Sequence, residues 1–282
     1  MTFTLIGHGG LTLVGTQTSG PRPGSPPVLL LHGGGQTRHA WGGTAEALAA
    51  RGFSCHCLDL RGHGESDWSP GGDYSLAAYL GDVEAAARHC GAPPIGVGAS
   101  LGGIILLLAA ARLAPGTLAG LVLVDIAPRM EPAGVARIVG FMTAYPEGFL
   151  SVEAAADAIA AYLPHRERPR DLRGLAKNLR QREDGRFVWH WDARLFTPGN
   201  LAAQADAKLL EEAARALHLP TLLVRGGLSD LLSDEGVAEF RALAPHAEFA
   251  DVRGAHHMVV GDQNDAFTAA VDDFLTRRFG RG

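Results

Sequence analysis

A short motif, Gly98-Ala99-Ser100-Leu101-Gly102, constrains the fold of this chain more than any other feature. A short apolar run precedes it and the apolar stretch 104–111 follows it, so a buried strand is expected before the motif and a buried helix after it. A serine on such a tight strand-to-helix turn needs small residues two positions before and two positions after it, and glycine occupies both places. The pattern therefore predicts an α/β fold with Ser100 raised over the end of a strand.

The motif alone leaves three interpretations open. Ser100 could cap a glycine-rich helix start, since serine is a favoured N-cap residue. The pair Gly96 and Gly98 also begins like the dinucleotide-binding pattern Gly-x-Gly-x-x-Gly, but Leu101 stands where the third glycine belongs. In the third interpretation the serine is a nucleophile, whose hydroxyl points over the sheet edge toward the first free N–H groups of the helix.

Composition narrows the class of protein. The chain has 282 residues, of which 46% are hydrophobic and 20% charged, with a formal net charge of -5. Such a chain can form one large α/β domain or two small ones, and its charge gives no reason to expect nucleic acid or an anionic membrane as partner. No stretch approaches the length of a membrane span and no secretory signal is evident, so we expect a cytoplasmic protein that acts on a small molecule.

The three cysteines do not predict a metal site or a disulfide framework. Cys55 and Cys57 alternate on one expected strand and so point to the same face of it, whereas His56 between them points to the other. Together with Cys90 they cannot all pair, and small buried side chains are the simpler interpretation. We expect no metal and no cofactor.

Strand and helix patterns alternate along most of the chain, as in a parallel sheet with helices on both faces. Strands are expected at 28–31, 53–58, 94–99, 121–128, 219–227 and 247–252, after an N-terminal hairpin at 3–6 and 11–15. Helices are expected at 44–51, 75–90, 101–112, 233–244 and 265–279.

The alternation stops between residues 129 and 216, where the pattern is helical. An insertion of this size between two strands is well placed to form a lid, so the sequence predicts a core of residues 1–128 and 217–282 and a helical lid of residues 129–216. Trp189 and Trp191, near the end of the insertion, supply the kind of side chains that a pocket under a lid requires.

Three reactive side chains follow three of the expected strands. Ser100, Asp230 and His257 each come just past the end of a buried strand, where the active sites of open parallel sheets lie. The glycines of His32-Gly33-Gly34-Gly35, after another such strand, allow a backbone N–H to turn inward toward a developing negative charge.

These features together resemble the α/β-hydrolase family over almost the full length of the chain. The resemblance rests on the Ser100 motif and on four further segments: 32–35, 59–66, 224–230 and 254–257. It implies a mostly parallel central sheet of about eight strands with helices on both faces and a helical lid. It also implies the roles of five residues: Ser100 as nucleophile, His257 as base, Asp230 as the acid that orients the base, and the N–H groups of Gly34 and Leu101 as the oxyanion hole.

Several of these assignments have rivals in the sequence. Aligning Gly254 with the family's Gly-x-Gly-His pattern places His257 rather than His256 at the catalytic position. Asp125 is the rival for the acid, because some relatives place it after the strand that follows the nucleophile, and Asp230 is preferred. His63, between two glycines, is interpreted as part of a tight structural turn.

A serine at position 100 implies an acyl-enzyme, in contrast to the aspartate that forms an alkyl-enzyme ester in haloalkane dehalogenases and epoxide hydrolases. The expected substrate is a small-molecule carboxylic ester or lactone, with Gly35, Trp189 and Trp191 as candidate substrate-binding residues, and the expected protein is a monomer or homodimer. Perhydrolysis and carbon–carbon bond hydrolysis by the same triad remain alternatives, as does a ligand receptor or signalling protein that turns over slowly or not at all.

Overall fold

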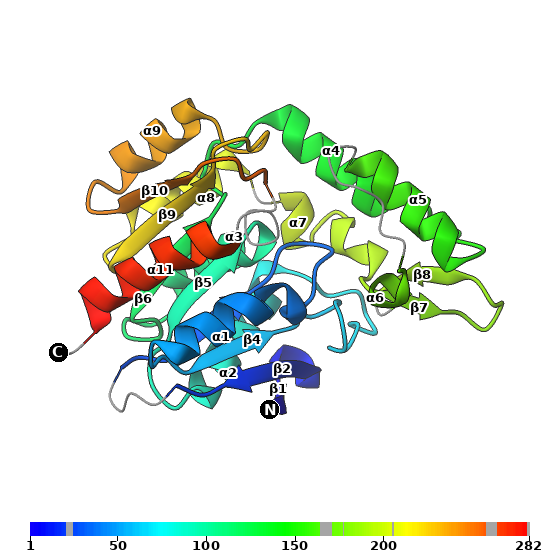
Figure 1. Ribbon diagram of the computed structural model, residues 1–282, viewed down its shortest axis with the longest axis horizontal. Helices are drawn as coiled ribbons and strands as arrows, with labels where there is room; N and C mark the ends of the chain where they lie inside the picture. The colour runs from blue at the N-terminus through cyan, green and yellow to red at the C-terminus, as the bar shows by residue number, and fades with distance from the viewer. Residues whose placement is uncertain (21–24, 164–170, 177, 205, 258–263, 281–282) are drawn as a thin grey trace.

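A mostly parallel sheet of eight strands runs through the molecule in the order β1-β2-β4-β3-β5-β6-β9-β10 (Figure 1). The structure, a computed structural model, describes residues 1–20, 25–163, 171–176, 178–204, 206–257 and 264–280. The strands are β1 (Thr2–Ile6), β2 (Thr12–Thr18), β3 (Val28–Leu31), β4 (Cys55–Leu58), β5 (Ile95–Ala99), β6 (Gly120–Val124), β9 (Thr221–Gly226) and β10 (Glu248–Val252). The predicted α/β architecture with about eight strands is confirmed.

The sheet is parallel from β4 to β10, and β2 runs antiparallel to both of its neighbours, β1 and β4. Its central strands are apolar on both faces because helices cover both. On β3, Leu29 and Leu31 enter one buried core, while Val28 and Leu30 enter the other. The alternation of side chains along a strand thus divides one apolar run between two layers.

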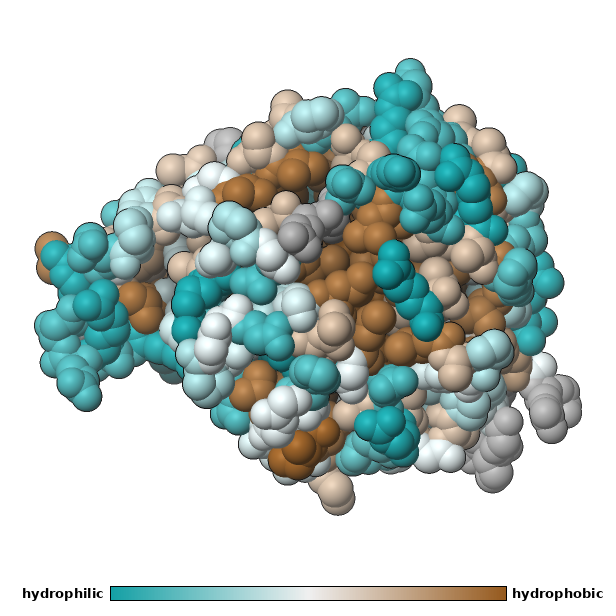
Figure 2. All heavy atoms as spheres, turned by 180° about the vertical axis from the view of Figure 1, so that it is seen from behind, coloured by the Kyte–Doolittle hydropathy of each residue, from teal (hydrophilic) through white to brown (hydrophobic). Residues whose placement is uncertain are grey.

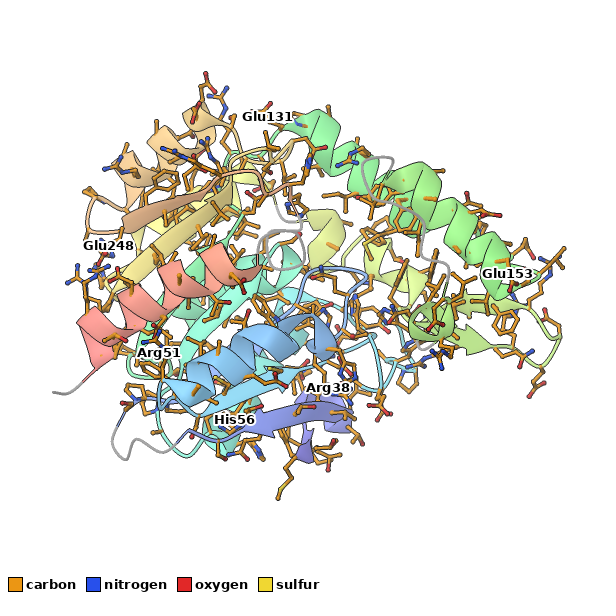
Figure 3. All side chains as sticks on the ribbon, viewed as in Figure 1. Arg38, Arg51, His56, Glu131, Glu153 and Glu248 are labelled. Carbon is orange, nitrogen blue, oxygen red and sulfur yellow. The ribbon has the colours of Figure 1, made fainter. Side chains whose placement is uncertain are left out.

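Helices α1 (Gly42–Ala50) and α11 (Asn264–Phe279) lie side by side on one face of the sheet (Figures 1 and 3). Arg51, at the end of α1, pairs with Asp272 of α11 at 3.5 Å. The opposite layer contains α2 (Leu76–His89), α3 (Leu101–Arg112), α8 (Ala207–Arg215) and α9 (Asp234–Leu243). Cys55 and Cys57 are buried in the layer beneath α1, where burial raises the pKa of the Cys57 thiol to about 12.

The segment between β6 and α8 stands apart from the sheet, and we call its elements the cap. They are α4 (Pro132–Thr143), α5 (Val152–Tyr162), α6 (Arg173–Ala176), the strands β7 (Leu179–Gln181) and β8 (Phe187–Trp189), the short helix η3 (Ala193–Phe196) and α7 (Leu201–Gln204). Two short helices of the core complete the fold, η1 (His8–Gly10) and η2 (Arg38–Trp41).

The cap differs in one respect from the helical lid that the sequence predicts. Strands β7 and β8 form an antiparallel hairpin that turns at Asp184 and Gly185, and Gly185 adopts a positive φ of 83°. An Asp-Gly turn between short runs with β-forming residues is a typical hairpin signal. Helix α8, at the end of the predicted lid, packs against α3 of the core. The division at residues 129 and 216 stays a prediction.

Among the described residues, no helix is both long enough and apolar enough to cross a bilayer. Figure 2 shows apolar side chains gathered in the middle of the face opposite to that of Figure 1, with hydrophilic side chains around them.

Candidate active site

Ser100 occupies a strained position between β5 and α3. Its φ of 48° and ψ of -117° lie in a region that L-residues other than glycine rarely adopt, and such strain is found mainly at functional sites. The side chain makes no capping hydrogen bond to the helix. The interpretation of Ser100 as a simple N-cap is therefore not supported by its geometry.

Glycines hold the strand and helix close enough for this turn. A Cβ at Gly98 would lie 2.5 Å from the carbonyl oxygen of Gly102, and one at Gly102 would lie 2.3 Å from that of Leu31. Both distances are far below any van der Waals contact, so any larger residue at either position would push the backbone apart. The glycine spacing of the motif follows from this close approach.

His257 is oriented by a buried carboxylate that belongs to Asp125. The Nδ1 of His257 lies 2.7 Å from Oδ2 of Asp125, whose side chain is fully buried. Asp125 also accepts hydrogen bonds from the N–H of Gly226 at 3.0 Å and from the hydroxyl of Ser229 at 2.5 Å. These bonds fix the carboxylate, so that the Nδ1–H of the imidazole donates to it and Nε2 is left as an acceptor.

The expected contact between Asp230 and His257 is wrong. Asp230 lies in the loop after β9 with its side chain 45% exposed, and it pairs with Arg137 of the cap at 2.5 Å. Asp125 directly follows β6, and its N–H donates to the carbonyl of Val224 on the neighbouring strand β9. It therefore stays at the sheet edge, whereas the three residues that separate Asp230 from the end of β9 carry its carboxylate outward to α4.

Two backbone N–H groups beside Ser100 have no acceptor within the part of the chain that the structure describes. They belong to Gly34 and Leu101. Their neighbours are all satisfied: the N–H of Gly33 donates to Gln36, that of Gly35 to His63, and that of Gly102 to the carbonyl of His32. Donors left free beside a serine can stabilise a negative oxygen formed there.

Three buried histidines, which we call the histidine row, hold the loop that carries Gly34. His32, His63 and His190 are at most 2% exposed, and their ring centroids are 5.1 Å apart for the first pair and 6.1 Å for the second. The Nδ1–H of His32 donates to the carbonyl of Gly33 at 2.8 Å. The row therefore packs directly behind the residues that would face an oxyanion.

The peptide of Gly35 is held on both sides by the other two members of the row. Its N–H donates to Nε2 of His63 at 3.2 Å, and its carbonyl accepts from Nε2 of His190 at 3.2 Å. Nδ1 of His190 in turn accepts from the N–H of Gly64 at 2.9 Å. The structural role expected for His63 is confirmed, while His190, which comes from the cap, was not expected to take part.

These bonds require neutral imidazoles, because each ring uses one nitrogen as an acceptor. Burial lowers the pKa of His32 to about 3 and that of His190 to about 4, and it places the pKa of His63 well below its usual range. The nearby rings of the row lower the pKa values of His32 and His63 further, because two positive charges this close repel one another.

A cavity of about 680 Å³ lies between Ser100 and the cap. His257 lines it together with Ser100, and so do the three expected substrate-binding residues Gly35, Trp189 and Trp191. The indole rings of Trp189 and Trp191 stack with centroids 4.8 Å apart and planes at 10°. A cavity of this size suits a small-molecule ligand. Among the described residues, no group of three or more His, Cys, Asp or Glu is arranged to hold a metal ion.

The sequence did not single out the apolar residues of the cap that face this cavity. Ile138, Phe141 and Met142 come from α4, and Ile159 and Tyr162 come from α5. The signal was present, because Ile138, Phe141 and Met142 recur at the i, i+3 and i+4 spacing of one helix face. That spacing shows which face is apolar but does not show what the face covers.

Comparison with known proteins finds relatives over most of the chain. Residues 26–263 match the family model described as alpha/beta hydrolase fold. The chain is 33% identical over 276 residues to esterase Rv0045c of Mycobacterium tuberculosis, covering 90% of this chain and 84% of that protein. It is 28% identical to a 3-hydroxybutyrate-oligomer hydrolase of Cupriavidus necator, covering 83% and 84%. A crystal structure of an alpha/beta hydrolase from Novosphingobium aromaticivorans, 28% identical, covers 98% of both chains with a TM-score of 0.80.

Proposed function

Because this chain belongs to the alpha/beta hydrolase fold family, we propose that it is a serine hydrolase that cleaves a carboxylic ester or lactone through an acyl-enzyme. One observation carries the proposal. A strained Ser100 and a His257 whose Nδ1 is bound to buried Asp125 line the same cavity. The relatives reported above are named as hydrolases, one of them as an esterase, which supports the class of reaction.

The reaction follows from the chemistry of these groups. A serine hydroxyl is a weak nucleophile at neutral pH, so Nε2 of His257 takes its proton as Oγ attacks the ester carbonyl. Asp125 stabilises the imidazolium that forms and keeps its Nδ1–H directed toward the carboxylate. We assign Asp125 to this role in place of Asp230.

The attacked carbonyl oxygen becomes an oxyanion, and the N–H groups of Gly34 and Leu101 are its proposed donors. Removal of one such donor in other enzymes raises the barrier by about 3 kcal/mol, so this is a large part of the catalysis. The imidazolium then returns the proton to the leaving alcohol, and water, activated by the same imidazole, hydrolyses the acyl-Ser100 ester.

The test combines turnover with covalent labelling. The wild-type protein should hydrolyse short-chain p-nitrophenyl esters and be labelled by a fluorophosphonate, and Ser100→Ala should lose both. Labelling that persists in Ser100→Ala would place the nucleophile elsewhere. A single labelling event by the ester with no further release of p-nitrophenol would instead favour a slow or non-catalytic ligand-binding protein.

A further inference from the structure

Ser100 lies where two cavities of very different size meet. The second cavity has a volume of about 110 Å³ and is lined by residues of α3, α4, η3 and α7. Its lining is apolar apart from the serine itself, and the residues that it does not share with the large cavity include Leu101, Ile104, Val139, Leu195 and Phe196. The shared residues are Gly34, Ser100, Ile138 and Met142. A substrate bound at Ser100 therefore has two separate spaces for its two ends.

Met142 forms part of the boundary between the two spaces. Its side chain is 5% exposed and packs against Gly34, where an added Cβ would lie 3.1 Å from the sulfur. Its carbonyl accepts a hydrogen bond from the indole N–H of Trp191 at 3.2 Å. Contacts with Gly34 and Trp191, which both line the large cavity, therefore hold Met142 in place, and its side chain is buried.

The two spaces differ in the chemical groups that they offer. His257 lines only the large cavity, and Leu101, whose N–H is a proposed oxyanion donor, lines only the small one. In the acylation step the Ser100 Oγ–C bond forms and the bond between the carbonyl carbon and the alcohol oxygen breaks. The proton passes from Oγ to Nε2 of His257 and then to that alcohol oxygen, so the alcohol must leave on the side of His257.

We propose that the small cavity binds the acyl group and the large cavity binds the alcohol, so that the preferred substrate is a neutral ester of a short aliphatic acid with a bulky aromatic alcohol. This assignment rests on the proposed serine hydrolase function. After the alcohol leaves, a water molecule takes its place beside His257, gives a proton to Nε2 and breaks the acyl-Ser100 bond, releasing the short acid.

The size of the small cavity sets the length of the acyl group. A dry apolar cavity of about 150 Å³ in another protein binds benzene, so 110 Å³ accommodates a chain of about four carbon atoms. The large cavity offers flat aromatic walls from Phe141, Tyr162 and the stacked indoles of Trp189 and Trp191. No Asp, Glu, Lys or Arg is among the described residues that line either cavity. This favours a substrate that carries no charge at either end.

A pair of esters with exchanged ends tests the orientation. In 1-naphthylmethyl butyrate the small group is the acid and the aromatic group is the alcohol, whereas in butyl 1-naphthylacetate the two are reversed. Both are alkyl esters of aliphatic acids, and their rates of alkaline hydrolysis correct for intrinsic reactivity. We expect kcat/KM for the first ester to exceed that for the second by at least about tenfold. Equal values, or the reverse preference, would overturn the proposal.

Two matched variants test the cavities separately. Val139 lines only the small cavity and Ile159 only the large one. Val139→Phe should lower the ratio of kcat/KM for 1-naphthylmethyl butyrate over 1-naphthylmethyl acetate by at least about tenfold, because one methylene in a tight pocket has effects of that size. Ile159→Phe should leave this ratio unchanged. A ratio that falls in Ile159→Phe and not in Val139→Phe would place the acyl group in the large cavity.

The failure of this proposal differs from failure of the hydrolase function itself. If neither ester is hydrolysed and Ser100 is not labelled by a fluorophosphonate, the proposed function is wrong. If Ser100 is labelled and esters are hydrolysed without the expected preference, the hydrolase stands and the assignment of the two cavities is wrong.

Discussion

Both carboxylate oxygens of Asp125 accept hydrogen bonds, so the effect of replacing this residue is easy to interpret. We predict that Asp125→Asn lowers kcat by about 10³- to 10⁴-fold, because an amide facing Nδ1 of His257 favours the wrong tautomer while keeping the shape of the side chain. The matched control is Asp230→Asn, which removes only a half-exposed ion pair with Arg137 and should change kcat by less than about threefold. Steady-state kinetics on p-nitrophenyl butyrate decide between them, and a larger loss in Asp230→Asn would restore the assignment made from sequence.

The sequence predicted Ser100 and His257 at the cavity but not their carboxylate, and the reason lies in the loops. Ser100 is fixed by a motif whose glycines have no steric alternative, and His257 follows a short turn. Asp125 and Asp230 both follow apolar strands in the sequence, but one begins its loop and the other lies four residues into it. Where a side chain four residues into a loop points depends on tertiary contacts, here the guanidinium of Arg137, which no local pattern contains.

At the scale of secondary-structure elements, the cap is attached to the core by hydrogen bonds around the turn 61–66. The N–H of Asp192 donates to the carbonyl of Gly62 at 2.9 Å, and the indole N–H of Trp68 donates to the carbonyl of His190 at 3.1 Å. The hydroxyl of Tyr74 donates to Asp192 at 2.5 Å. The strand and helix order of the core followed from apolar patterns, whereas this attachment depends on polar groups brought together from distant segments, so the sequence did not predict it.

His190 connects this attachment to the loop of Gly34, and its replacement should affect both stability and rate. We predict that His190→Phe lowers the free energy of unfolding by about 2–4 kcal/mol, because the carbonyl of Gly35 and the N–H of Gly64 lose their partners in a partly buried place. It should also lower kcat per labelled active site by about tenfold or more, because the N–H of Gly34 is then less well oriented. Urea unfolding and kinetics normalised by fluorophosphonate labelling provide the two measurements.

Tyr74→Phe is the matched control for His190→Phe. It removes another buried bond between cap and core, to Asp192, and the two hydrogen bonds that the structure describes for the tyrosine hydroxyl go to Asp192 and Ser69 rather than to the loop of Gly34. Its stability should fall to a similar extent while kcat per labelled site stays within about twofold of the wild type. If both variants lose rate equally, His190 contributes only to folding.

At the scale of the whole molecule, buried neutral histidines make stability depend on pH. His32, His56 and His190 have pKa values lowered by burial to about 3, 4 and 4, and that of His63 also lies well below its usual value. In the unfolded chain each binds a proton near pH 6.5, so below that pH the unfolded state holds more protons than the folded state. Stability is therefore complete above pH 6.5 and is lost as the pH falls toward 4.

The expected slope follows from the number of protons. Each such histidine contributes about 1.4 kcal/mol per pH unit in this window, and the four together contribute roughly 5 kcal/mol per pH unit at the steepest point. Urea unfolding at intervals between pH 7.5 and 4.5 measures the slope. His56→Gln, which removes one buried imidazole far from Ser100, should reduce it by about one proton. A free energy of unfolding that stays constant between pH 7 and 5 would contradict the assignment of these rings as neutral.

The bond from His190 to Gly35 has a consequence for engineering this scaffold. A designer who wished to change specificity would exchange the inserted segment for that of a homologue, since Ser100, Asp125 and His257 all lie outside it. Such a chimaera would have different residues lining the cavity, but it would also lose the imidazole of His190, which donates a hydrogen bond to the carbonyl of Gly35. Active hybrids are expected only from homologues whose segment carries a hydrogen-bonding ring at the position of His190. A segment without such a ring would first need a histidine introduced at that position.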